Sequence, residues 1–117
     1  MTEQMGQALQ TDHTSLQCPS CGAPTLHHDA VNVYFRQEDA DEGIAVAVNG
    51  GAIGSMVKVD AAADQVPVAV STSQAGNPSP RRDGVAIRFW CESCEATPVL
   101  NIIQHKGDTI VEWGHVN

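Results

Sequence analysis

The sequence has few large side chains and few basic ones. Aromatic residues make up 4% of its 117 residues, and six Lys and Arg face fourteen Asp and Glu, for a formal net charge of −8. The shortage of bulky side chains predicts a single domain with a modest core. The shortage of cations argues against a protein whose main task is to grip phosphate backbones. The acidity suits solubility or a basic protein partner.

Several functional signals are missing as well. No apolar stretch is long enough to span a membrane, and the chain does not open with a basic segment followed by an apolar one. We therefore expect a cytoplasmic protein without membrane association. The phosphate-binding pattern G-x-x-x-x-G-K-[ST], the hydrolase pattern G-x-S-x-G and the H-x-E motif of zinc deaminases do not occur. These absences predict that the protein is not an enzyme.

The four cysteines form two C-x-x-C pairs, Cys18 with Cys21 and Cys91 with Cys94. Each pair places two sulfurs on one tight turn, and two such turns facing each other complete a tetrahedron around an ion about 2.3 Å from each sulfur. Without an export signal, paired cysteines are more often metal ligands than disulfides. We therefore predict one structural Zn²⁺ per chain, bound by all four cysteines. Because residues 22–90 separate the pairs, the fold has to bring the two turns together.

The first turn, C-P-S-C-G at residues 18–22, starts with a proline that fixes φ and ends with a glycine that is free to take the left-handed conformation. This C-P-x-C-G pattern resembles the knuckle of the zinc-ribbon family. The second turn, C-E-S-C-E at residues 91–95, lacks both the proline and the glycine. The resemblance therefore covers the two knuckles and implies a β-rich zinc ribbon with a long β insertion between them.

Three other uses of the cysteines compete with zinc. Rubredoxin binds iron with similar knuckles, but its second knuckle usually carries proline and glycine, which makes iron the weaker interpretation. Two redox dithiols would predict a strand-to-helix context, whereas the flanking segments here look like strands. Disulfides would require that the protein be exported by a route that the sequence does not reveal.

Alternation of apolar and polar residues predicts strands along most of the chain. We place them at 25–36, 44–48, 53–59, 66–70, 85–90, 98–104 and 109–113. Asn49-Gly50 is a favoured hairpin turn before the third of these strands, and Pro67 assigns the fourth to a sheet edge. Residues 71–84, rich in Ser, Pro and Gly, predict a long surface loop.

The predicted fold class is therefore all-β, a zinc-ribbon-like antiparallel sheet of about six or seven strands with one structural metal site. Residues 1–14 are polar and show no apolar period, so we expect a disordered N-terminal tail. Residues 15–117 form the single zinc-stabilised domain.

Other polar and aromatic residues have ordinary explanations. The acidic stretch at 38–42 does not match an EF-hand loop and predicts a solvated turn. We expect Arg81 and Arg82 to pair with local carboxylates such as Asp83, and Trp90 and Trp113 to pack beside the metal site. The histidines are expected on the surface, because four cysteines already complete a tetrahedral site; these are His13, His27, His28, His105 and His115.

Three functions fit these features. The first is a non-catalytic zinc-binding domain that acts by binding another macromolecule, most often a protein. The second is an acidic inhibitor of a nucleic-acid-binding protein, similar in size and charge to phage anti-CRISPR factors. The third is a nucleic-acid-binding zinc ribbon, against which Glu92 and Glu95 on the second knuckle count. The oligomeric state is left open.

Removal of residues 1–14 is expected to leave thermal stability nearly unchanged, because a polar segment without apolar period adds little to a core. Circular dichroism melts of the full-length and truncated proteins test this. A large drop in Tm would mean that the tail pairs as a strand or packs on the domain.

Overall fold

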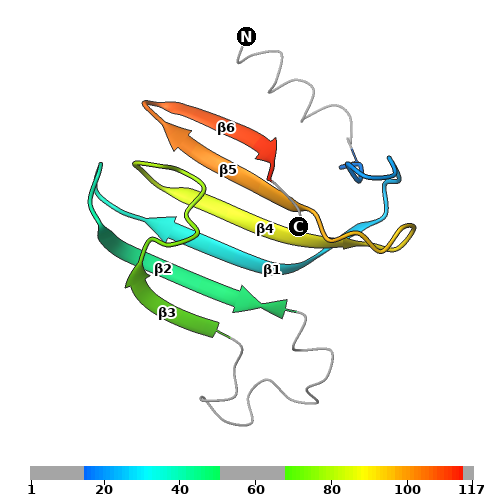
Figure 1. Cartoon of the computed structure of the whole chain (residues 1–117), viewed down its shortest axis with the longest axis horizontal. Helices are drawn as coiled ribbons and strands as arrows, with labels where there is room; N and C mark the ends of the chain where they lie inside the picture. Colours follow the sequence, from blue (N-terminus) through cyan, green and yellow to red (C-terminus); the bar gives the residue numbers. More distant parts are fainter. Residues whose placement is uncertain (1–14, 51–67, 115–117) are drawn as a thin grey trace.

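A computed structural model describes residues 15–50 and 68–114 of the chain. In these residues it contains no helix and one antiparallel sheet of six strands, in the order β3-β2-β1-β4-β5-β6 (Figure 1). The strands are β1 (Leu26–Phe35), β2 (Glu42–Asn49), β3 (Val68–Ser73), β4 (Gly84–Cys91), β5 (Val99–His105) and β6 (Asp108–Trp113). The all-β prediction is confirmed. No helix in the described ranges has the length and apolar character needed to cross a bilayer.

The strands lie close to where residue alternation places them. β4, β5 and β6 form the expected meander, and Gly107 takes a positive φ of 90° in the turn that joins β5 to β6. β1 and β4 are the two central strands, joined by a register that runs from Leu26–Cys91 to Tyr34–Gly84. The predicted tail at 1–14 and the predicted strand at 53–59 lie outside the described residues.

β3 lies at a sheet edge, as predicted for the strand at 66–70, but the predicted C-terminal end of that strand was wrong. β3 runs to Ser73, because Ser71 and Ser73 continue its antiparallel register with Ala45 and Glu42 of β2. The loop expected at 71–84 is therefore confined to residues 74–83 in the structure. Serine alternating with small residues does not break a strand when a neighbouring strand supplies the hydrogen bonds.

The two faces of the sheet differ sharply in composition. On one face, the strand pairing aligns two rows of side chains that run across the sheet, with one residue from each strand in each row. All twelve of these residues are apolar. We call this surface the apolar face: Val70, Val46, Val33, Val85, Ile102 and Val111 in one row, and Val68, Val48, Val31, Ile87, Leu100 and Trp113 in the other. The central row of the opposite face carries small or polar residues, among them Asn32, Ala47, Ala69, Ala86 and Asn101. The row beside it also holds Tyr34, Ile103 and Ile110.

Few apolar side chains are buried, because the described residues form a single layer. The buried ones are Cys18, Tyr34, Ala45 and Cys91, together with Pro98. Tyr34 lies on the opposite face under the loop that follows β3, where Gly76 approaches its hydroxyl. Its neighbour Phe35, which points the other way, is 52% exposed. The core is as modest as the composition predicts, and it lies at the two ends of the sheet.

A polar network organises the end of the sheet opposite the cysteines. The Arg36 guanidinium donates to the carbonyl oxygens of Arg82, Ala40 and Ser79, at 3.2, 3.1 and 2.8 Å. Ser79 is 1% exposed, and its hydroxyl donates to the Gln104 carbonyl at 3.0 Å and accepts from the Arg82 N–H at 2.9 Å. The loop at 74–83 is thus held to both the β1–β2 turn and β5.

Replacement of Ser79 by alanine is expected to destabilise the fold by about 1–3 kcal/mol, because it removes two part-buried hydrogen bonds, each with a net contribution of about 0.5–1.5 kcal/mol. Chemical denaturation measures the change. Ser73→Ala is the matched control: that hydroxyl also accepts a backbone N–H, from Ala75, but it is exposed and water replaces the bond. Equal losses in the two variants would contradict this account of the network.

Candidate metal centre

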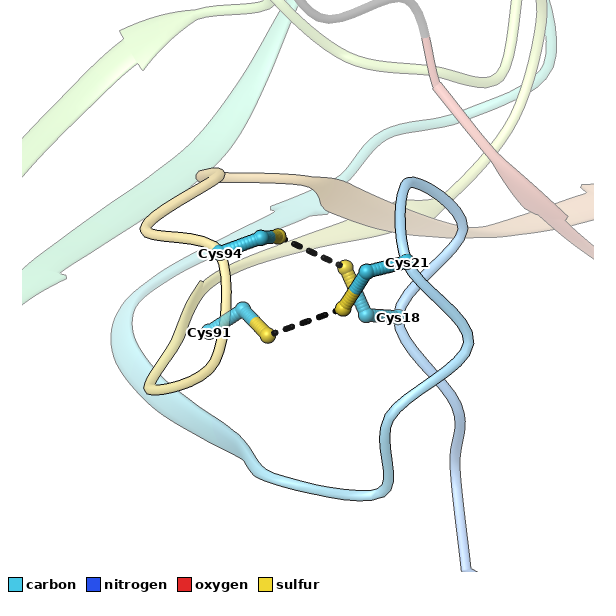
Figure 2. Close-up of side chains that lie close together, drawn as sticks. All are labelled: Cys18, Cys21, Cys91 and Cys94. Carbon is cyan, nitrogen blue, oxygen red and sulfur yellow. Dashed lines mark hydrogen bonds between the residues drawn. The ribbon is translucent and has the colours of Figure 1, made fainter.

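The pairing of β1 with β4 brings the two C-x-x-C turns together. The first turn precedes β1 and the second follows β4, and the two strands are antiparallel neighbours with Leu26 opposite Cys91. Both turns therefore lie at the same end of the sheet (Figure 1). In Figure 2 the four cysteine side chains point from the two turns into the space between them. The two pairs are far apart in sequence because β1, β2, β3 and β4 lie between the two turns, and the pairing of β1 with β4 closes this distance.

The two turns have the same backbone hydrogen bonds. The N–H of Cys18 donates to Ala23 O and the N–H of Gly22 donates to Cys18 O, at 2.9 and 2.7 Å. The second turn repeats this pattern one for one: Cys91 donates to Ala96 O at 2.9 Å, and Glu95 donates to Cys91 O at 2.8 Å. Each C-x-x-C is therefore closed in the same way.

The second turn reaches this shape without the glycine that the first one has. Gly22 has a φ of 81°, and the equivalent Glu95 has a φ of 65°. A non-glycine residue in the left-handed region costs roughly 1–2 kcal/mol. The departure of residues 91–95 from the C-P-x-C-G pattern thus changes the local energy of the knuckle but not its conformation.

The sulfur positions fit a tetrahedral ion. The four Sγ atoms lie within 4.8 Å of one another. The closest contacts join one knuckle to the other, Cys18 to Cys94 and Cys21 to Cys91, both at 3.7 Å. Four sulfurs at about 2.3 Å from one zinc would be about 3.8 Å apart. The cysteines are free thiols rather than disulfides, and the donor set of four thiols suits a soft or borderline metal such as zinc or iron.

The electrostatics of the cluster favour a bound cation. The Thr25 hydroxyl, 3.5 Å from Cys91 Sγ, lowers the pKa of that thiol to about 6. Burial raises the pKa of Cys18, but the backbone N–H groups of Cys21 and Ser20 outweigh it and lower the pKa. Cys94 behaves oppositely: the Ala96 N–H lowers its pKa, but burial and the three neighbouring thiols raise it to about 12. Four thiolates crowded at this spacing need a positive charge between them.

Thr25 was not recognised as part of the site from the sequence. Its hydroxyl lies 2.9 Å from the Ser93 hydroxyl, and its carbonyl accepts the N–H of Glu92 at 3.1 Å. It therefore connects the segment after the first knuckle directly to the second knuckle. No local pattern marks such a residue, because its partners are more than 60 positions away.

The aromatic residues near the cysteines lie on both faces of the sheet. Trp90 is 41% exposed and stacks on His27 with ring centroids 4.5 Å apart, and His27 also pairs with Glu92. The expectation that Trp90 would be packed against the metal site was therefore wrong. On the apolar face, Trp113 meets Phe89 edge to face at 6.0 Å and lines a surface cavity with Cys18.

No histidine of the described ranges joins the cysteine cluster. His28 packs edge-on against Phe89, and His105 ends β5 at the other end of the sheet. His13 and His115 lie outside the described residues.

The two adjacent arginines pair with carboxylates, as expected, but with different ones. Arg81 donates to Asp39 at 2.7 Å and to Glu38 at 2.8 Å, and Arg82 reaches Glu38 at 2.9 Å. The hydrogen bond from Arg81 lowers the pKa of Asp39. Asp83, the partner expected from its sequence proximity, instead accepts the backbone N–H of Arg36.

Comparisons with known proteins add no relative: no protein-family model, no curated protein and no solved structure matches this chain.

Glu95→Gly is expected to stabilise the protein by about 1 kcal/mol, because glycine adopts the left-handed conformation without strain. Gly22→Ala is expected to cost a similar amount, since a Cβ at Gly22 meets no atom within 4 Å and only the φ of 81° opposes it. Denaturation of the metal-bound proteins measures both.

Glu95→Ala is the control, because it removes the same charge and keeps the strain. If Glu95→Ala stabilises the protein as much as Glu95→Gly, the effect is electrostatic and the two knuckles are not conformationally equivalent.

Proposed function

We propose that this protein is a non-catalytic β domain that binds one zinc ion through Cys18, Cys21, Cys91 and Cys94 and acts by binding another protein. The observation that carries the proposal is the pair of equivalent knuckles, whose sulfurs approach one another at 3.7 Å although they lie 70 and 76 positions apart in the sequence. Two turns with the same hydrogen bonds and a tetrahedral sulfur spacing are typical of a structural zinc site.

A structural role for the ion follows from the small core. Few apolar side chains are buried, and two of them, Cys18 and Cys91, belong to the site itself. A zinc ion would join the segment before β1 to the segment after β4 and so add the long-range connection that side-chain packing does not supply. Four thiolates would also fill the tetrahedron and leave no position for a reactive water, which argues against catalysis at this site.

A protein partner has more support than a nucleic acid. The exposed knuckle residues include Glu92 and Glu95, which would repel phosphates. The cations Arg81 and Arg82 are engaged with Glu38 and Asp39, so neither sign of charge at that turn is fully available. The same pairing weakens the case for an inhibitor that offers its acidic turn to a basic protein.

Removal of the metal is expected to unfold the domain. Structural zinc contributes an apparent binding free energy of roughly 10–16 kcal/mol at neutral pH, which matches or exceeds a typical domain stability of about 5–15 kcal/mol. A chelator, Cys91→Ser, or acid that protonates the thiolates should each abolish the cooperative melt seen by circular dichroism. Elemental analysis of the purified protein should give one zinc, rather than iron, per chain.

Ser20→Ala is the matched control within the first knuckle, because it keeps all four sulfurs and the backbone N–H that lies 3.4 Å from Cys18 Sγ. It should retain zinc and melt like the parent. A metal-free protein that melts cooperatively within a few degrees of the metal-bound one would refute the structural role, and purified protein without zinc would refute the site.

A further inference from the structure

The apolar face is continuous, and none of the segments in 15–50 and 68–114 forms a second layer over it. Its two rows cross all six strands without interruption, and none of its twelve residues is buried. The exposed fraction is highest on the edge strands, 70% for Val70 and 59% for Val111, but the central residues Val33 and Val85 are also only half-buried. A sheet face of this composition normally packs against a second layer.

Charge is excluded from this face. The chain carries a formal net charge of −8, yet no Asp, Glu, Lys or Arg stands at any of the twelve positions. The charged residues of the central and meander strands lie elsewhere: Arg88 and Glu112 align with the opposite face, and Asp29 pairs with Arg88 at 2.8 Å. This surface offers no ion pairs to a basic partner. It is complementary to another apolar surface, because contact between the two removes apolar area from water.

The opposite face does not offer a comparable surface. Its central row holds alanine, asparagine and Glu112, its isoleucines Ile103 and Ile110 are confined to β5 and β6, and the loop at 74–83 covers part of it above Tyr34. The apolar face is therefore the larger uniform apolar surface among the described residues.

We propose that the apolar face is a homodimer interface, in which two copies of this chain pack face to face as a two-layer β-sandwich. This inference rests on the proposed function as a protein-binding domain and names the partner. Two copies related by a two-fold axis present the same patch to each other, and aligned sheets about 10 Å apart allow the valines and isoleucines of the two layers to interdigitate. Two negatively charged chains tolerate this contact because neither brings a charge to it.

The size of the face suits a specific dimer. Six strands about 4.8 Å apart make a sheet about 25 Å wide, and the rows with their flanking apolar residues extend about 20 Å along the strands. The footprint is on the order of 500 Å² per copy, or about 1,000 Å² for the pair, which meets the lower limit of about 1,000 Å² for a biological interface and corresponds to a small, reversible dimer.

The test compares two neighbouring residues of β2 that point to opposite faces. Val46 lies on the apolar face between Val70 of the edge strand and Val33 of the central strand β1, and Ala47 is exposed on the opposite face. The full-length, zinc-loaded protein should be a dimer by sedimentation equilibrium. Val46→Glu should raise the dimer dissociation constant by at least about 100-fold, because each copy buries a carboxylate in the apolar interface. Ala47→Glu adds the same charge and should leave the dimer intact.

Zinc content and circular dichroism are recorded on every sample, so that loss of the fold is not mistaken for loss of the dimer. If Val46→Glu does not fold, the double variant Val70→Glu/Val111→Glu decides, since both side chains are more than half exposed in the single chain. It should fold and be monomeric.

Three results would overturn the inference. The first is a parent protein that is monomeric at all concentrations, and the second is one that forms only polydisperse aggregates. The third is a dimer that persists in folded Val46→Glu or Val70→Glu/Val111→Glu, which would place the contact at a sheet edge. A zinc-loaded monomer would refute the dimer and leave the proposed metal site standing, whereas a protein without zinc would refute the metal site whatever its oligomeric state.

Discussion

The antiparallel pairing of β1 with β4 is the contact on which the rest of the structure depends. These two strands are the centre of the sheet, and the register that sets Leu26 opposite Cys91 also sets the two knuckles opposite each other. A shift of one residue would turn every side chain of β1 to the other face and would mix the apolar and small-residue surfaces. The thiol cluster and the segregation of the two faces are therefore consequences of one register.

Each end of this single-layer sheet is held by a different kind of interaction. At one end, four thiols and the Thr25–Ser93 pair join the segments that flank β1 and β4. At the other end, Arg36 and the buried Ser79 join the β1–β2 turn, the loop at 74–83 and β5 through backbone carbonyls. Between the ends the sheet has little buried apolar volume. With this distribution, a metal bound by the four cysteines would contribute more to stability than it would in a domain with a packed second layer.

The composition of the two faces changes how the acidity of the chain is understood. Net charge alone suggests a basic partner, but the carboxylates Glu38 and Asp39 already pair with Arg81, and the apolar face has no charge at all. Negative charge at the rims and on the opposite face favours solubility, while the apolar face carries the proposed contact with a second copy. In this proposal, solubility and recognition depend on different parts of the same sheet.

Local sequence patterns determined most of the strands and the four candidate metal ligands. Alternation over 26–35 and 84–91 specifies strands because successive side chains point to opposite faces, and C-x-x-C specifies a knuckle because both sulfurs sit on one turn. Only the tertiary structure decided the features that depend on residues far apart in the sequence. The sequence of residues 91–95 does not reveal that Glu95 adopts the same left-handed conformation as Gly22, because the fold imposes this positive φ. Proximity in sequence favoured Asp83 as a partner for the arginines, whereas the sheet brings Glu38 and Asp39 to them. Strand order and register arise from contacts between residues tens of positions apart, and so the meeting of the four sulfurs and the continuity of the apolar face are properties of the fold rather than of any segment.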